Sequence, residues 1–200
     1  MSSGRGYLVL LSAFGWLTCG WLVSCATVPE ASAPSEYLDE QTGATVTAVD
    51  KPVVFARDRS ERAANLRDYV TIAPAAVNRG GNREVVLVAY IWSTLDARFE
   101  PAKADTNSLV LVADDRRIRL NANGKTPADL GIARAVYAPP GQAVKPLVFP
   151  TDIATLRFIA ATRSLQVQTS IDDVVVSYEI WDDQRAAVDR FARFLSGERE

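Results

Sequence analysis

The sequence predicts an α+β fold: a mostly antiparallel β domain that ends in a strand–helix–strand–strand–helix unit. Short runs of alternating apolar and polar residues recur from residue 44 onward, and turn-forming glycines and asparagines separate several of them. Helical spacing of apolar residues is strongest in the C-terminal third. Strands followed by helices are typical of α+β proteins, and a β-sandwich with a terminal helix is the alternative.

The first 25 residues differ from the rest of the chain. They carry one charged side chain, Arg5, and residues 7–22 form an apolar stretch of 16 residues. A membrane-spanning helix needs about 20 apolar residues. We therefore expect a secretory signal peptide over residues 1–24.

The end of this stretch, Leu22-Val23-Ser24-Cys25, resembles the lipobox of bacterial lipoproteins. An aliphatic residue stands three positions before the cysteine and a small residue directly before it. The resemblance implies a diacylglycerol on the thiol of Cys25, cleavage before Cys25 and, often, acylation of the new amino group. Cys19 does not fit, because Trp16 and Thr18 occupy the corresponding positions.

Two or three acyl chains hold a protein at a bilayer. We therefore expect the membrane to be one partner of the chain, through acyl chains on Cys25. Ala26 follows the cysteine, and in enteric lipoproteins such a residue is compatible with export. The expected location is the bacterial cell envelope, with the protein anchored in the outer membrane on its periplasmic face.

Residues 25–43 are expected to be the lipidated cysteine and a flexible tether, since small, polar and proline residues dominate the segment after Cys25. A single periplasmic β-rich domain is expected over residues 44–200.

The first strands of this domain are predicted from short apolar runs at residues 44–49 and 52–55. The charged segment 57–68 predicts a short helix or a solvated loop. Residues 69–77 and 84–92 then flank Asn78-Arg79-Gly80-Gly81-Asn82, which predicts a β-hairpin with a longer loop.

A second hairpin is predicted over residues 108–113 and 116–121, around Asp114-Asp115. In its return strand Ile118 and Leu120 alternate with arginines, so that one face is expected to be buried and the other wet. Residues 122–143 are rich in glycine and proline and predict an irregular excursion with one short helical turn.

The C-terminal unit begins with a predicted strand at residues 144–149 and a helix that starts at 150–152. Strands are predicted at 164–169 and 174–181. Asp182 or Asp183 is expected to cap a last helix, which ends at Ser196-Gly197. One apolar stripe is predicted on this helix, formed by Ala187, Val188, Phe191, Phe194 and Leu195.

The hairpin Asp68-Tyr69…Val77-Asn78-Arg79-Gly80-Gly81…Tyr90-Ile91-Trp92 and the C-terminal unit together resemble uncharacterised proteobacterial envelope lipoproteins. This resemblance supplies no catalytic motif.

The composition argues against most kinds of catalytic site. The chain has no histidine, and its two cysteines both lie within the first 25 residues. The usual general base and the commonest metal ligand are therefore missing. No catalytic, metal-binding or cofactor-binding residue and no cofactor is predicted. The net charge of −2 also gives no reason to expect nucleic acid as a partner.

Three motifs contain residue types that also occur in functional sites. Gly124-Lys125-Thr126 matches the end of a phosphate-binding loop, but Arg119 stands where that motif requires glycine, so a turn is predicted. The adjacent aspartates 114–115, 172–173 and 182–183 predict turns and caps, with a weak cation site as the alternative. Trp92 and Trp181 each end a predicted strand, where they either pack over the sheet or anchor a partner.

We therefore expect a lipid-anchored envelope protein with a non-catalytic binding or scaffolding role and a protein partner in the envelope. One alternative is a hydrolase of an envelope polymer that depends on carboxylates or lysines, which would need two converging carboxylates in a deep pocket. The other is a carrier of small ligands or lipids, which would need an apolar cavity.

Overall fold

The fold is known from a computed structural model, which describes residues 33–60, 65–94, 107–141, 143–171 and 173–198. In this part of the chain ten antiparallel strands belong to one sheet and two α-helices lie in the C-terminal third, which confirms the predicted α+β class. Because the strands form one continuous sheet, the sandwich alternative was wrong. The predicted signal peptide and Cys25 lie outside the described residues.

The elements follow one another in the order β1 (Ser35–Asp39), β2 (Ala44–Ala48), β3 (Val53–Asp58), β4 (Arg67–Arg79), β5 (Asn82–Ser93), β6 (Ser108–Ala113), β7 (Arg116–Asn121), the 3₁₀ turn η1 (Pro127–Leu130), β8 (Leu147–Pro150), α1 (Ile153–Ala161), β9 (Leu165–Ile171), β10 (Val174–Asp182) and α2 (Arg185–Ser196). Within the described residues no helix is both long and apolar enough to cross a bilayer.

The long hairpin β4–β5 organises the sheet. Gly80 and Gly81 adopt φ angles of 59° and 86°, so two residues make the turn and the longer loop predicted from sequence was wrong. On its other edge β4 pairs first with β3 and then with β2. Pro74 lies in the gap between these two partners, a position that suits a residue without an N–H.

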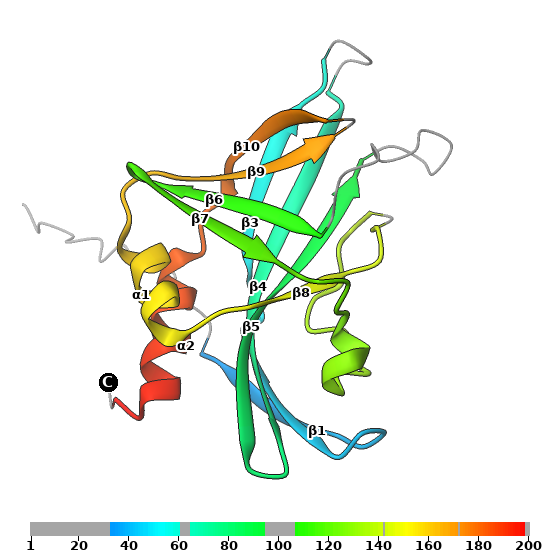
Figure 1. Cartoon of the computed structure of the whole chain (residues 1–200), viewed down its shortest axis with the longest axis vertical. Helices are drawn as coiled ribbons and strands as arrows, with labels where there is room; N and C mark the ends of the chain where they lie inside the picture. Colours follow the sequence, from blue (N-terminus) through cyan, green and yellow to red (C-terminus); the bar gives the residue numbers. More distant parts are fainter. Residues whose placement is uncertain (1–32, 61–64, 95–106, 142, 172, 199–200) are drawn as a thin grey trace, which may run out of the picture. The chain divides into compact units, whose positions relative to one another are not determined.

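From this hairpin the sheet curls back toward itself. The strand order is β1-β2-β4-β3-β10-β9-β6-β7, and β5 pairs with both β4 and β8. β7 returns to lie beside β8, and just beyond β7 the carbonyl oxygen of Lys125 accepts the N–H of Val148 at 3.0 Å. Figure 1 shows the two helices side by side at one end of the curled sheet.

The main core fills the inside of this curl. Its fully buried side chains come from the strands and from both helices, among them Phe55, Leu111, Phe149, Leu156 and Phe191. A second apolar cluster lies on the outer face of β4, β5 and β8 and is covered by residues of the 122–143 excursion, including Leu130, Val136 and Tyr137. The excursion contains the single short helical turn that was predicted, η1.

β1 corrects the predicted tether of residues 25–43. It pairs with β2 over its whole length, so the folded domain begins before residue 44. Among its side chains only that of Asp39 is buried. An edge strand is held mainly by backbone pairing and needs little apolar surface, so composition gave no sign of it.

The last helix also differs in two details from its prediction. It begins at Arg185 after Gln184, which makes no side-chain cap hydrogen bond, so the predicted cap at Asp182 or Asp183 was wrong. Asp182 ends β10, and the carboxylate of Asp183 instead binds the Arg185 guanidinium at 2.6 Å and its N–H at 3.2 Å. Phe194 is 49% exposed at the margin of the stripe, whereas Ala187, Val188, Phe191 and Leu195 are buried as predicted.

Candidate functional site

Three aromatic side chains and one arginine meet on the outer face of the sheet. The rings of Tyr69 and Trp92 stack with 4.1 Å between centroids and 9° between planes. Trp181 meets Tyr69 edge to face at 6.2 Å, and the guanidinium of Arg67 lies 4.3 Å from the centre of the Trp181 ring. We refer to these four residues as the aromatic cluster.

The β4–β5 turn places the first pair. With two residues in the turn, Tyr69 lies directly opposite Trp92 in the register. Aromatic cross-strand pairs of this kind stabilise antiparallel sheets. The indole N–H of Trp92 donates to the hydroxyl of Thr71 at 3.0 Å, so the polar atom of this buried ring is satisfied.

An irregularity in β10 places Trp181. Ile180 pairs with Phe55 and Asp182 pairs with Val54, which leaves Trp181 as an extra residue in the ladder. Such bulges re-aim side chains. The small side chain of Ala56 separates β4 from β10 here, so the rings of Trp181 and Tyr69 can meet across β3.

The members of the aromatic cluster differ in their exposure to solvent. Trp92 is 7% exposed, whereas Trp181 is 54% exposed. The 122–143 excursion approaches Trp92 closely: a Cβ on Gly141 would lie 2.6 Å from the carbonyl oxygen of Ser93 and 3.1 Å from the Trp92 ring. The cluster therefore has a packed base and a single accessible ring, Trp181, that is held by neighbours on one face and one edge.

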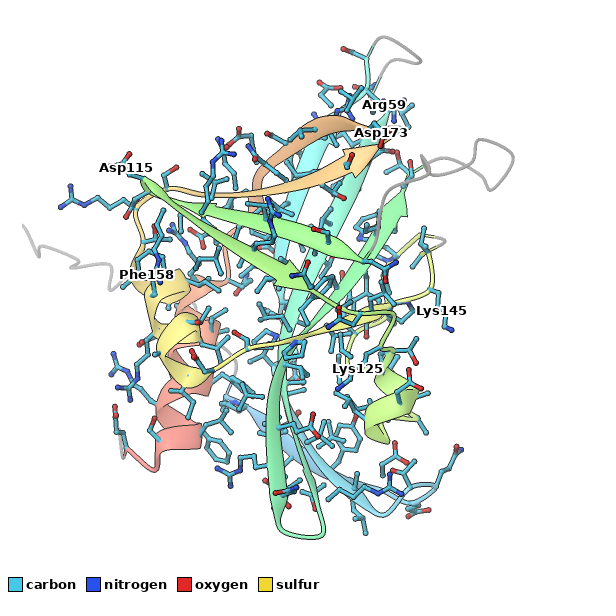
Figure 2. All side chains as sticks on the ribbon, viewed as in Figure 1. Arg59, Asp115, Lys125, Lys145, Phe158 and Asp173 are labelled. Carbon is cyan, nitrogen blue, oxygen red and sulfur yellow. The ribbon has the colours of Figure 1, made fainter. Side chains whose placement is uncertain are left out.

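The aspartates of these pairs that the structure describes form no joint site. Figure 2 shows Asp115 and Asp173 at the tips of two different hairpins. Asp114 has a φ of 51° in its turn and accepts the N–H of Ser164 at 2.8 Å. That hydrogen bond is the main reason why the pKa of Asp114 is lowered. Asp114 thus lies in the predicted turn, and its carboxylate joins that turn to the residues before β9, whereas Asp182 lies within β10.

The remaining motifs also have local structural roles. Asn123 and Gly124 have φ angles of 51° and 74°, which confirms the turn predicted at Gly124-Lys125-Thr126. Thr126 and Asp129 then form the capping box of η1. Among the residues that the structure describes, no three His, Cys, Asp or Glu side chains come together in a way that could hold a metal ion.

The charged segment 57–68 is not the helix or solvated loop that was predicted, as far as it is described. Residues 57–58 extend β3, residues 67–68 begin β4, and Arg59 binds Asp68 at 2.6 Å with both side chains about nine-tenths buried. Burial, together with the charge of Asp68, raises the pKa of Tyr178 to about 12. This phenol stays protonated at neutral pH and is part of the core.

One cavity lies in the core between the sheet and the helices. It is lined by residues such as Phe55, Leu87, Ile159 and Val188 and measures ≈ 10 Å³. One water molecule needs about 10–15 Å³. This cavity therefore has no room for a lipid or a small ligand.

Sequence reasoning singled out Trp92 and Trp181 but missed Tyr69 and Arg67 as their neighbours. A signal for Tyr69 was present, since a two-residue turn at Gly80-Gly81 pairs residues 69 and 92 directly. The contact of Arg67 and Trp181 joins β4 to β10 across β3, and no local pattern in the sequence indicates that order of strands. In comparisons with models of protein families, with curated proteins and with solved structures, the chain has no significant match.

Proposed function

We propose that the chain is a lipid-anchored protein of the bacterial envelope with a non-catalytic binding or scaffolding role, and that Trp181 anchors its protein partner. The observation that carries this proposal is the exposed ring of Trp181, braced by Arg67 and Tyr69. Tryptophan and arginine are enriched among the residues that dominate binding energy in protein interfaces. A ring that is already held in place loses less conformational entropy when a partner binds.

The alternatives find less support. A hydrolase would need converging acid and base groups, yet the carboxylates of Asp114 and Asp152, whose pKa values are lowered, accept the backbone N–H groups of Ser164 at 2.8 Å and Thr155 at 2.6 Å. A carrier would need an apolar cavity, and the cavity between the sheet and the helices measures only ≈ 10 Å³. A glycan partner is less favoured than a protein, because Arg67 already occupies one face of the Trp181 ring.

The proposal is tested by photo-crosslinking in intact cells, with the crosslinking residue placed at position 179 or 182 of the full chain. We expect a discrete protein adduct that Trp181→Ala reduces about 30-fold, the equivalent of a loss of about 2 kcal/mol. Phe194→Ala is the matched control, since Phe194 is an aromatic residue of similar exposure on α2.

Equal adduct formation in both variants, or no adduct at all, would contradict the proposal. An adduct that resists protease and is cleaved by glycosidases would instead identify a glycan as the partner.

A further inference from the structure

A polar hollow lies on the outer face of β6, β7, β9 and β10, away from the aromatic cluster. Its volume is ≈ 290 Å³. Arg117 and Arg119 of β7 line it, and because they are two residues apart on one strand they point to the same side with Cα atoms about 7 Å apart. Ile118 and Leu120 point the other way, toward the core.

The two guanidinium groups lack a carboxylate partner within the described residues. Some other arginines have a carboxylate partner: Arg185 binds Asp183 at 2.6 Å and Arg193 binds Asp189 at 2.7 Å. The nearest carboxylate in the same row of the sheet is Glu179, which is three strands away and binds Gln166 at 2.7 Å. As far as the chain is described, two positive charges therefore face this hollow without a paired carboxylate.

The rest of the lining adds hydroxyl groups and apolar surface. Ser108 of β6 and Ser170 of β9 supply hydroxyls, which can donate hydrogen bonds to an oxyanion. Val110 and Val175 supply apolar surface, and Val175 is 66% exposed. Charge on an edge strand also discourages pairing with other chains, but that role requires neither a hollow nor hydroxyls beside the charges.

We propose that this hollow binds the phosphate head group of an anionic amphiphile. Two guanidinium forks and two hydroxyls offer more donors than one carboxylate can accept, whereas a phosphate group presents several strong acceptor oxygens. The exposed valines beside the charges would contact the apolar part of the same molecule, which free phosphate lacks. The site is separate from the surface assigned to the protein partner, and it does not depend on that assignment.

The probe is dihexanoyl phosphatidic acid, titrated into the full chain in an uncharged detergent and followed by NMR of the valine methyl and arginine Nε–H signals. We expect Arg117→Gln with Arg119→Gln to weaken binding about tenfold or more. The matched control is Arg79→Gln with Arg116→Gln, which removes the same charge. Arg79 is exposed at the β4–β5 turn, and Arg116 lies over the Phe158 ring at 5.0 Å.

Two further variants separate the contributions. Replacing both Arg117 and Arg119 by lysine keeps the positive charge of the hollow and removes the planar guanidinium groups. This change should also weaken the binding of phosphatidic acid. Val175→Ser should weaken binding of the amphiphile and leave the weak binding of inorganic phosphate unchanged. Equal weakening by the control pair, equal affinity for octanoate or for inorganic phosphate, or no binding of phosphatidic acid would each overturn the proposal.

Discussion

The carboxylate of Asp39 accepts the backbone N–H of Ala133 at 2.7 Å, across 94 residues of sequence. The same carboxylate accepts the N–H groups of Arg134 and Gln41, each at 3.1 Å. Asp39 thus joins the edge strand β1 to the excursion that covers the outer face of β4 and β5. One side chain thus connects two segments that lie far apart in the sequence.

The hydrogen bonds of the Asp39 carboxylate predict a contribution to stability that is lost in acid. Burial alone would raise the pKa of Asp39, but the N–H groups of Arg134, Ala133 and Gln41 and the hydroxyl of Thr42 outweigh it and lower the pKa below 3.8. The stabilisation is therefore present above pH 3.8 and is lost as the pH falls through the lower pKa of the folded state. Asp39→Asn should lower the Tm at neutral pH, and the difference from the unmodified chain should shrink below about pH 4.

Thermal unfolding at a series of pH values measures this difference. Glu40→Gln, a change at the exposed neighbouring carboxylate, should leave the Tm nearly unchanged. A Tm difference between Asp39→Asn and the unmodified chain that stays constant down to about pH 2 would contradict the stabilising role of the Asp39 carboxylate.

Phe191→Ala should destabilise the domain by about 3–5 kcal/mol. The Phe191 side chain is 0% exposed and packs among residues of the sheet and both helices. Phe194→Ala on the same helix removes a side chain that is 49% exposed and should cost about 1 kcal/mol or less. Urea unfolding measures the loss of stability in both variants. Equal losses would show that the buried face of α2 has been assigned wrongly.

Gly141→Ala should destabilise the excursion by about 1–3 kcal/mol, because the added methyl would lie 2.6 Å from the Ser93 carbonyl oxygen. Displacement of the loop from Trp92 should raise the exposure of that indole and shift its fluorescence to longer wavelength. Ala138→Ser, at an exposed position of the same loop, should have neither effect. An unchanged spectrum and stability in Gly141→Ala would contradict the close packing.

Cys25→Ser should abolish lipidation and the cleavage that depends on it, since the thioether to diacylglycerol requires a thiol. Cys19→Ser should change neither, because Cys19 belongs to the expected signal peptide. Fatty-acid labelling followed by membrane fractionation distinguishes the two variants. Label retained after Cys25→Ser would remove the basis for the proposed anchoring.

The strands with strong apolar alternation could be predicted from the sequence. The bounds of β6 and β7 agree with the predicted 108–113 and 116–121, because Leu109, Leu111 and Leu120 face a continuous core there. β1 could not be predicted, since its stability comes from backbone pairing and from the hydrogen bonds of Asp39. The hydrogen bond of Asp39 to Ala133 depends on a partner segment 94 residues away and leaves no local pattern.

The candidate site was predictable only in part. Trp92 and Trp181 could be singled out because each ends a predicted strand. The register of the hairpin explains why Tyr69 stacks on Trp92. Trp181 lies on the outer face because Tyr178 and Ile180 face the core, and the register shift between β3 and β10 falls at this residue. Pairing between distant strands sets that shift, so the composition around Trp181 does not reveal it.

The pairing of β3 with β10 also sets the order in which the fold can form. It joins residues 54–56 to residues 179–182, so β3 lacks its neighbour on that side until synthesis has passed residue 182. Contacts between such distant segments form slowly, because closing a long loop must precede any gain from pairing. A chain that ends before residue 174 would leave the edge of β3 unpaired and the interior without Tyr178 and Phe191. The sheet is therefore completed only after β10 has been made, and chains that lack β10 should be prone to aggregate.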